Sequence, residues 1–581
     1  MPSLHFSVSL QLHPTSKSIR AQVCTMDTAA RVCSDCGLTA KHSEEPLLCC
    51  SHCRSAFYHD GSCQANHHKR EHSAVCSFIA KKKDKSKCRS RGLEVIESIS
   101  QKDTSSSRFM VISSQEFQKG QMVLIEPPAM FFDENKSNGA HEMFQAFLCL
   151  SKAEQDSILK LLPLSASSTL PDTPQVLLEA YATFQARNER AAQYLTIEIA
   201  QKIFVILNEN ALVFQLSTTP TYFTGLFLTA SKIGHSCAPN VSLRVEDGLA
   251  SCRCDKRIRS LDQVSISFMT SVYEHPRLER QRWLLENKGF ECQCSRCLAF
   301  DECQPVYCSQ CAMGIMFHHG KSNQWVCTSC KAGVGCYDDL QIQLQLDKME
   351  CFAIEMDAIR DLIGRSEEDE DNESALEDDL ALALSNLLSL TKSFETIHHM
   401  SWLHMTACRL LSEVASEMAR RIVMQNSYSE TGSAYARLDP RVKELFRLSA
   451  LVMLHRVSWL QVNVAVVQGV ISLEKAAHQK PILEPLQFNE NGVPFSQIYH
   501  AVRLICDIPE PCTVSQYLQE IFVAGQDLIL AGDIALAYRL YKRMGPSLLK
   551  CVQLSKEDRQ CIQLFLDSKG QENPFEDVSM D

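Results

Sequence analysis

The sequence predicts an α+β protein: a β fold interrupted by a helical insert, accompanied by zinc-binding modules and followed by an all-α C-terminal domain. Short runs between residues 93 and 268 alternate with the period of half-buried strands, whereas residues 140–213 follow helical period. Cysteines recur in C-x2-C and C-x-C spacings, which suit metal chelation better than bridges between distant strands. From about residue 338 the apolar residues return to helical period.

The bulk composition is that of a globular chain. Its 581 residues are enough for roughly three or four domains. The net charge of -11 argues against a dominant nucleic-acid grip by the whole chain. We find no uninterrupted apolar run of about 18 residues and no secretion signal, so we expect no membrane span. A cytoplasmic or nuclear location with reduced thiols follows as an expectation.

The N-terminal segment 1–32 is expected to be flexible. Residues 1–26 contain no acidic residue and several Ser, Lys and Arg, which is the composition of an organelle transit peptide. Met26 is an alternative start, because the organised sequence begins just after it. Both alternatives stay open.

A zinc module is predicted for residues 33–76. This segment has few large apolar residues, so metal would have to supply the folding energy, about 10–16 kcal/mol apparent per site. A disulfide cluster is the alternative. The potential ligands are Cys33, Cys36, Cys50, Cys53, His59, Cys63, His72 and Cys76.

The run CSHCRSAFYHDGSCQ, Cys50 to Gln64, resembles the MYND zinc finger, with His59 where that family has cysteine. The resemblance implies a protein-docking surface for proline-containing peptides. It also implies two interleaved sites: Cys33, Cys36, His59 and Cys63 on one zinc, and Cys50, Cys53, His72 and Cys76 on the other. His68 is a rival of His72, and Cys49 is a rival of Cys50.

A basic run at residues 81–91 lies in the linker 77–92. Such a run is typical of a solvated linker. A nuclear-localisation signal or a nucleic-acid-binding patch is the alternative.

Residues 93–298 are predicted to form the split β domain, with its helical insert at about 140–213. The expected strands are 93–99, 109–112, 122–125, 224–228, 241–245, 251–254 and 264–268. Lys119-Gly120 is the expected turn between the second and third of these strands, and Pro127-Pro128 closes that hairpin.

A second cysteine group ends this domain. Cys292, Cys294 and Cys297 cannot complete a four-coordinate zinc site alone, so a fourth ligand must come from elsewhere in the fold. Cys237, far earlier in the chain, is our candidate for that ligand. One zinc would then join the middle of the chain to the end of the β domain.

Three stretches of this domain match a known family. IGHSCAPNVSL, from Ile233, resembles the NHSCxPN motif of SET-domain protein-lysine methyltransferases, and GFECQCSRC, from Gly289, resembles their post-SET cysteine motif. QKGQMVLIEPPAMFF, from Gln118, resembles the first SET strands. With the MYND module, the chain is similar to SET and MYND domain (SMYD-like) proteins, although here the first SET strands follow the MYND module instead of preceding it.

The resemblance implies transfer of a methyl group from S-adenosylmethionine to a lysine amine, with cofactor contacts at Gly234, His235 and Ser236. The functional positions depart from the family pattern. Gly234 replaces the motif asparagine, and Phe268 and Lys288 stand where the family has tyrosines. Tyr273 is a candidate to supply a hydroxyl, with a half-buried packing role as its alternative.

Each missing buried polar partner costs about 1–3 kcal/mol. We therefore expect a degenerate SET site that is weakly active or inactive, in a protein that acts through protein–protein interaction. The alternatives are an active S-adenosylmethionine-dependent protein- or histone-lysine methyltransferase, and a chromatin- or DNA-associated regulator.

A zinc ribbon is predicted at residues 303–336. Its ligands are Cys308, Cys311, Cys327 and Cys330. Four thiolates leave no open position for water, so this site is expected to be structural. Cys303 and Cys336 are expected to be bystanders, and His318-His319 an exposed loop. Together with the sites above, about four zinc ions per chain are expected.

Residues 338–567 are predicted to form a helical-hairpin, TPR-like C-terminal domain, followed by a polar tail at 568–581. The acidic run 367–371 is typical of a solvated loop, and contact with a basic partner such as a histone tail is its alternative. We expect a monomer.

Overall fold

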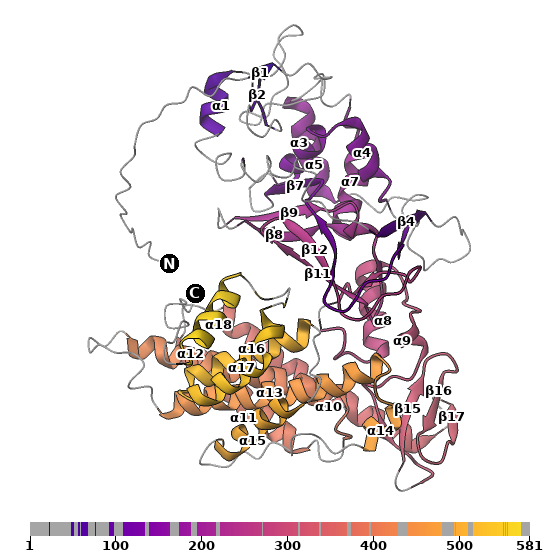
Figure 1. Ribbon diagram of the computed structural model, residues 1–581, viewed down its shortest axis with the longest axis vertical. Coiled ribbons are helices and arrows are strands. Elements are labelled where there is room, and N and C mark those ends of the chain that lie inside the picture. Colours follow the sequence, from indigo (N-terminus) through magenta and orange to yellow (C-terminus); the bar gives the residue numbers. More distant parts are fainter. Residues whose placement is uncertain are drawn as a thin grey trace. The chain divides into compact units, whose positions relative to one another are not determined.

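The computed structural model is drawn in Figure 1. It describes residues 22–23, 48–50, 56–58, 60–67, 76, 92–97, 109–133, 139–162, 174–187, 194–216, 221–269, 271–311, 314–335, 339–368, 373–393, 397–427, 440–478, 493, 495–508, 515–549, 551, 554 and 556–570. The chain divides into two compact units. One comprises Met1–Ser90, Ile125–Ser231 and Val245–Ala250, and the other comprises Arg91–Leu124, Lys232–Arg244 and Ser251–Asp581. The predicted mixture of sheet and helix is confirmed, while the predicted domain boundaries stay predictions.

The first unit contains a small sheet and a short helix near the N-terminus. The sheet has the order β1-β2-β3, from β1 (Gln22–Val23), β2 (Leu48–Cys49) and β3 (Phe57–Tyr58). Helix α1 (Gly61–His67) begins where the Asp60 carboxylate accepts hydrogen bonds from the amides of Ser62 and Cys63, both at 2.9 Å. These bonds satisfy amides that the first helical turn leaves without partners.

A second sheet of the first unit lies beside the helical insert. Its antiparallel order is β7-β9-β8, from β7 (Met130–Asp133), β9 (Tyr222–Leu226) and β8 (Leu212–Gln215). The helices are α3 (Gly139–Leu148), α4 (Lys152–Leu159), α5 (Gln175–Arg187) and α7 (Ile197–Asn210). Strand β8 therefore takes the last residues of the segment that we expected to be helical.

The remaining strands of the β region are short. They are β4 (Leu93–Glu97), β5 (Phe109–Ser113), β6 (Met122–Glu126), β10 (Gly234–His235), β11 (Val241–Glu246), β12 (Leu249–Cys254) and β13 (Ser265–Ile266). Strand β4 pairs with β5, β10 pairs in parallel with β13, and a three-stranded sheet has the order β11-β12-β6.

The predicted hairpin between residues 109–112 and 122–125 is wrong, because β5 and β6 pair with other strands. The segment between them pairs elsewhere: Phe117 forms a bridge with Ile258, and Gly120 donates to the carbonyl of Cys254 at 2.7 Å. Gly120 does form a turn, with a φ of 80° that favours glycine. The segment between β5 and β6 is thus too long for a two-residue hairpin turn, and it pairs instead with the segment that contains Cys254 and Ile258.

A four-stranded antiparallel sheet follows the β region, with strands in sequence order. They are β14 (Val306–Tyr307), β15 (Ile315–His319), β16 (Gln324–Cys327) and β17 (Gly333–Gly335). The prediction of an exposed loop at His318-His319 is wrong, because both residues lie in β15. His318 is only 8% exposed, its ring nitrogen Nε2 lies 3.1 Å from Asn323 Oδ1, and burial lowers its pKa to about 4.

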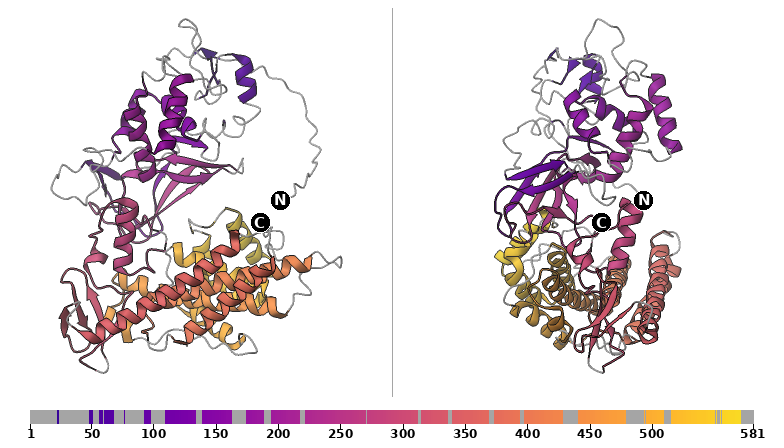
Figure 2. Two further views of the ribbon diagram at one scale, coloured as in Figure 1. Left: turned by 180° about the vertical axis from the view of Figure 1, so that it is seen from behind. Right: turned by 90° about the vertical axis from the view of Figure 1, so that its right-hand side faces the viewer.

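Helices make up the rest of the second unit (Figure 2). Helices α8 (Arg277–Lys288) and α9 (Ser295–Leu298) precede the four-stranded sheet. After it come α10 (Leu340–Glu368), α11 (Glu373–Ser393), α12 (Trp402–Ser427), α13 (Pro440–Val467), α14 (Leu473–His478), α15 (Phe495–Asp507), α16 (Ser515–Leu530), α17 (Ile534–Leu548) and α18 (Lys556–Asp567). The sequence did not lead us to expect α14 or α15.

Helix α13 forms the centre of this helical part, packed against α12, α15 and α16. Among the described residues it is the one helix that length and composition would allow to cross a membrane, and 67% of its most apolar window is buried within the protein. Its buried residues include Arg456 and Asn463. Both of these polar side chains bond partners from other segments, Arg456 with Glu274 and Asn463 with the carbonyl of Tyr273.

Candidate functional site

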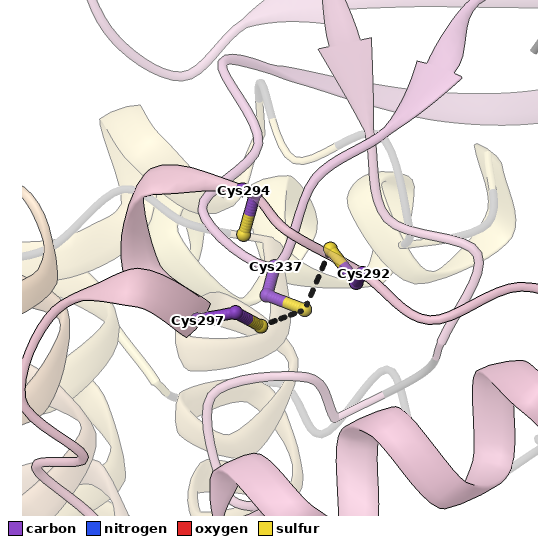
Figure 3. A group of neighbouring side chains, drawn as sticks. All are labelled: Cys237, Cys292, Cys294 and Cys297. Atoms are coloured by element: carbon purple, nitrogen blue, oxygen red, sulfur yellow. Dashed lines mark hydrogen bonds between the residues drawn. The ribbon is translucent and has the colours of Figure 1, made fainter. Parts of the chain in front are cut away.

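Four cysteines from distant segments meet in the second unit (Figure 3). Cys237 follows β10, Cys292 and Cys294 follow α8, and Cys297 lies in α9. Their sulfur atoms all lie within 4.8 Å of one another, with Cys237 Sγ at 3.8 Å from Cys292 Sγ and at 3.5 Å from Cys297 Sγ. Two thiolates on one tetrahedral zinc lie roughly 3.8 Å apart, so the donor set fits zinc. We call these four residues the thiol cluster.

A second group of four cysteines lies in the four-stranded sheet. Cys308 Sγ is 3.8 Å from Cys330 Sγ, and Cys311 Sγ is 3.7 Å from Cys327 Sγ. Gly314 makes room for them, because a Cβ at this position would lie 2.2 Å from the Cys327 sulfur. This group therefore also has the chemistry and the spacing of a structural zinc site.

The N-terminal module is described only in part. Cys50 Sγ and Cys76 Sγ lie 3.7 Å apart, which agrees with their expected place on one zinc. Cys63 is in helix α1. The other expected ligands, Cys33, Cys36, Cys53, His59 and His72, lie outside the described residues, as does the basic run 81–91. The interleaved ligand sets stay a prediction.

Arg296 bonds the backbone around the thiol cluster, and we did not identify it from the sequence. It lies between two of the cysteines, and its side chain is buried. The guanidinium donates hydrogen bonds to the carbonyl of Cys237 at 3.0 Å and to that of Val272 at 2.8 Å. Nε donates to Glu302 Oε1 at 2.7 Å, which pairs the buried charge. The position of an arginine inside a C-x-C-x2-C run was the available signal.

Arg280 of α8 supports the same cluster from another side. It is buried, and one guanidinium nitrogen lies 4.0 Å from Cys297 Sγ. The buried carboxylate of Asp301 lies 3.9 Å from the guanidinium and also accepts from the amide of Arg277 at 2.7 Å. Buried charges survive in a protein interior when they are paired in this way.

The motif around Asn240 is locked to the segment that contains β13. Asn240 Nδ2 donates to the carbonyl of Gln263 at 2.7 Å, and the amide of Ser265 donates to Asn240 Oδ1 at 2.8 Å. The amide of Ser236 donates to the carbonyl of Ile266 at 2.9 Å. These bonds, together with the parallel pairing of β10 and β13, fix the position of His235.

His235 is the centre of an aromatic group. Its Nδ1 accepts from the amide of Phe268 at 3.0 Å, and its Nε2 lies 3.3 Å from Cys237 Sγ. Its ring centroid lies 5.2 Å from that of Phe268 and 6.1 Å from that of Phe290. Burial lowers the pKa of His235 to about 4. The Lys288 ammonium lies 5.9 Å from the Phe268 ring centroid, a cation–π contact.

The structure therefore brings together most of the expected site positions. Phe268 contacts both His235 and Lys288, and Gly234 and Ser236 flank His235. Tyr273 has a different environment: it is 3% exposed, and the Arg296 guanidinium lies over its ring at 5.4 Å. This buried position favours a packing role for Tyr273 beside Arg296 over a role in which its hydroxyl faces a substrate.

Cys303 also differs from the expected bystander role. Its buried sulfur lies 3.5 Å from an Arg296 guanidinium nitrogen and 3.4 Å from Asn463 Nδ2. Cys303 thus packs among the groups that surround the thiol cluster. Cys336 lies outside the described residues.

Comparisons with known proteins agree with the sequence motifs. Histone-lysine N-methyltransferase ASHR1 of Arabidopsis thaliana is 31% identical over 116 residues, 18% of this chain and 24% of that protein. A SET and MYND domain-containing protein of Dictyostelium discoideum is 32% identical over 82 residues, 14% of this chain and 23% of that protein. The chain thus spans about a quarter of the length of these curated relatives.

Comparisons with family models and with solved structures give less information about the family. No family model matches the sequence. The crystal structure of the SET domain of LSMT bound to lysine and AdoHcy matches with a TM-score of 0.24 and 10% identity, over 67% of this chain and 93% of that chain. A TM-score of this size carries no argument about the fold. Over these short segments the chain is similar to a histone-lysine N-methyltransferase and to a SET and MYND domain-containing protein.

Proposed function

We propose that this chain is a zinc-stabilised protein of SET–MYND type that acts by binding other proteins and has weak or no methyltransferase activity. Its partners would dock through the N-terminal cysteine module, and proline-containing peptides and histone tails are the ligand classes to test. A cytoplasmic or nuclear location, and a monomeric state, belong to the same proposal.

The observation that carries this proposal is the environment of Phe268. Its amide is bonded to His235, its ring packs against His235 and Phe290, and the Lys288 ammonium lies over it. A SET-type site would have tyrosine hydroxyls at the positions of Phe268 and Lys288. A phenyl ring cannot donate or accept the hydrogen bonds that orient a reacting amine.

The cofactor position has lost a contact as well. Gly234 has no side-chain amide, whereas the related motif has asparagine there. The Asn240 side chain cannot replace it, because its amide and its oxygen are bonded to Gln263 and Ser265. The residues present therefore fit S-adenosylmethionine poorly, and we derive no reaction step through it. One lost buried contact corresponds to about 1–3 kcal/mol of binding free energy.

The two cysteine groups support the part of the proposal that describes the chain as zinc-stabilised. Both have four thiol ligands at the separations that tetrahedral zinc requires, and neither has a carboxylate or imidazole in the set that would suggest a catalytic metal. When bound, zinc would hold the four sulfur atoms as thiolates and fix the segments that contribute them.

An active methyltransferase is the alternative, because His235, Cys237 and Asn240 retain the motif. Calorimetric titration of the zinc-loaded protein with S-adenosylmethionine separates the two functions. Titration with a proline-rich peptide, with Cys50→Ser as a control that should lose the module, tests the docking role. Micromolar cofactor binding together with no peptide binding would reverse the proposal.

A further inference from the structure

We infer that metal binding at the thiol cluster controls how the segment 272–274 docks on helix α13, and that Arg296 is the positioning residue for this coupling. The inference rests on the zinc-binding part of the proposed function. It assigns to the metal a second role, which is to link the β region of the second unit to the helical core.

The first link runs from the metal ligands to the segment 272–274. Arg296 lies two residues after Cys294 and directly before Cys297, so bound metal would fix its backbone on both sides. Its guanidinium bonds the carbonyls of Cys237 and Val272 at 3.0 and 2.8 Å and approaches that of Tyr273 at 3.5 Å. One side chain thus joins both arms of the cluster to the segment 272–274.

The second link runs from that segment to α13. Asn463 Nδ2 donates to the same Tyr273 carbonyl at 2.6 Å. The neighbouring carboxylate of Glu274 forms a buried ion pair with Arg456, which lies about two helical turns before Asn463 on α13. Arg456 also pairs with Glu520 of α16 at 2.9 Å. The segment is therefore held between Arg296 on one side and two α13 side chains on the other.

Burial makes these links strong and mutually dependent. Arg296, Glu274, Arg456 and Asn463 are each at most 5% exposed. Water cannot replace a lost partner without opening the packing, so a break leaves a buried charge or amide without compensation. If metal favours the docked arrangement, thermodynamic reciprocity requires that docking favours metal binding by the same factor.

This reciprocity gives a sharp test, because Asn463 is not a cluster ligand. Asn463→Leu removes its amide and leaves a side chain of similar size. Zinc bound by the wild type and variants is titrated at equilibrium against a competing chromogenic chelator, and the binding step missing in Cys237→Ser identifies the cluster. We expect Asn463→Leu and Arg296→Lys to weaken zinc binding in this step by roughly tenfold.

Arg447→Lys is the matched control on the same helix. Arg447 links α13 to Asp533 at 2.9 Å and bonds Glu444 of the same helix, and neither of these partners belongs to the thiol cluster or to the segment 272–274. It should lower the melting temperature and leave the zinc affinity of the cluster unchanged. A zinc affinity for Asn463→Leu within twofold of the wild type, or an equal loss of affinity in Arg447→Lys, would overturn the inference.

Hydrogen exchange on the wild-type protein gives a second measurement if a variant does not fold. Removal of the cluster zinc should raise exchange around Asn463 on α13 more than exchange in α17. Equal protection of α13 with and without zinc would also overturn the coupling. If the wild type shows no zinc-binding step that depends on Cys237, the proposed zinc function itself fails, which separates the two outcomes.

Discussion

The main-chain amide of Phe268 donates a hydrogen bond to Nδ1 of His235 at 3.0 Å. This bond places a phenyl ring beside the one imidazole of the motif, where a SET-type site would present a hydroxyl. The local backbone is thus well ordered by hydrogen bonds, while Phe268 and Lys288 stand where the related motifs have tyrosines. The backbone hydrogen bond at this site is therefore present even though position 268 has no tyrosine hydroxyl.

Restoring the family residues should restore cofactor binding. The triple change Gly234→Asn, Phe268→Tyr and Lys288→Tyr is expected to tighten S-adenosylmethionine binding at least about fivefold, since the one buried contact restored at Gly234 is worth about 1–3 kcal/mol. A Cβ at Gly234 would meet only the side-chain tip of Gln263, at 3.3 Å, so the new asparagine can be accommodated. Calorimetric titration measures the effect.

Phe290→Tyr is the control for that experiment. It adds a hydroxyl to a neighbouring ring of the same aromatic group, 6.4 Å from Phe268 between centroids. It should leave cofactor affinity unchanged. If the triple variant binds no better than Phe290→Tyr, our alignment of these three positions with the family is wrong.

Asn240 should act on stability. Asn240→Ala leaves the Gln263 carbonyl and the Ser265 amide without their partners in a buried site, which we expect to cost about 2–4 kcal/mol of unfolding free energy. Asn287→Ala on α8 removes an exposed asparagine and should change stability by about 0.5 kcal/mol or less. Thermal unfolding compares the two, and equal effects would contradict the locking role of Asn240.

The ribbon metal should depend on Gly314. A Cβ there would lie 2.2 Å from Cys327 Sγ and 2.7 Å from Cys311 Sγ, so Gly314→Ala should displace the metal. Gly333→Ala in the same sheet, whose nearest contact would be at 3.6 Å, should retain it. Metal analysis should give about four zinc ions in the wild type and about one fewer in Gly314→Ala. Two or fewer in the wild type would contradict the assignment.

Asp527 should make stability depend on pH. Burial raises the pKa of this carboxyl from 3.8 to about 7, and it accepts a hydrogen bond from Ser449. Between these pKa values the folded chain keeps a proton that the unfolded chain loses. As far as it depends on Asp527, the free energy of unfolding is therefore highest below about pH 4 and falls as the pH rises towards 7.

Asp527→Asn should remove that dependence, because the amide stays neutral and keeps an acceptor for Ser449. At pH 8 the variant should be more stable than the wild type by up to about 4 kcal/mol, with little difference at pH 4. Melting temperatures at both pH values measure this. Asp507→Asn, an exposed site on α15, is the control, and an equal gain from it would rule out burial as the cause.

The sequence allowed prediction of features that depend on local spacing. The C-x-C-x2-C group with Cys237, the ribbon cysteines and most strands and long helices are where the pattern placed them. Metal geometry constrains the spacing of ligands that lie close together in the chain, so this spacing can be recognised in the amino-acid sequence. The same holds for the apolar period of α10, α12 and α13.

Features that depend on pairing over long distances were missed. The expected hairpin at residues 109–125 failed because strand partners are chosen by the whole sheet, not by the turn between them. We made no prediction for Arg296 and Arg280 from the sequence, and only the fold shows the carboxylates and carbonyls that compensate their burial. Asn463 could not be linked to Tyr273 for the same reason.

Titration of the zinc-loaded wild-type protein with S-adenosylmethionine tests the central claim most directly. The aromatic group at Phe268 and the missing amide at Gly234 predict no binding in the micromolar range. Binding with a micromolar dissociation constant would contradict the account and favour an active methyltransferase.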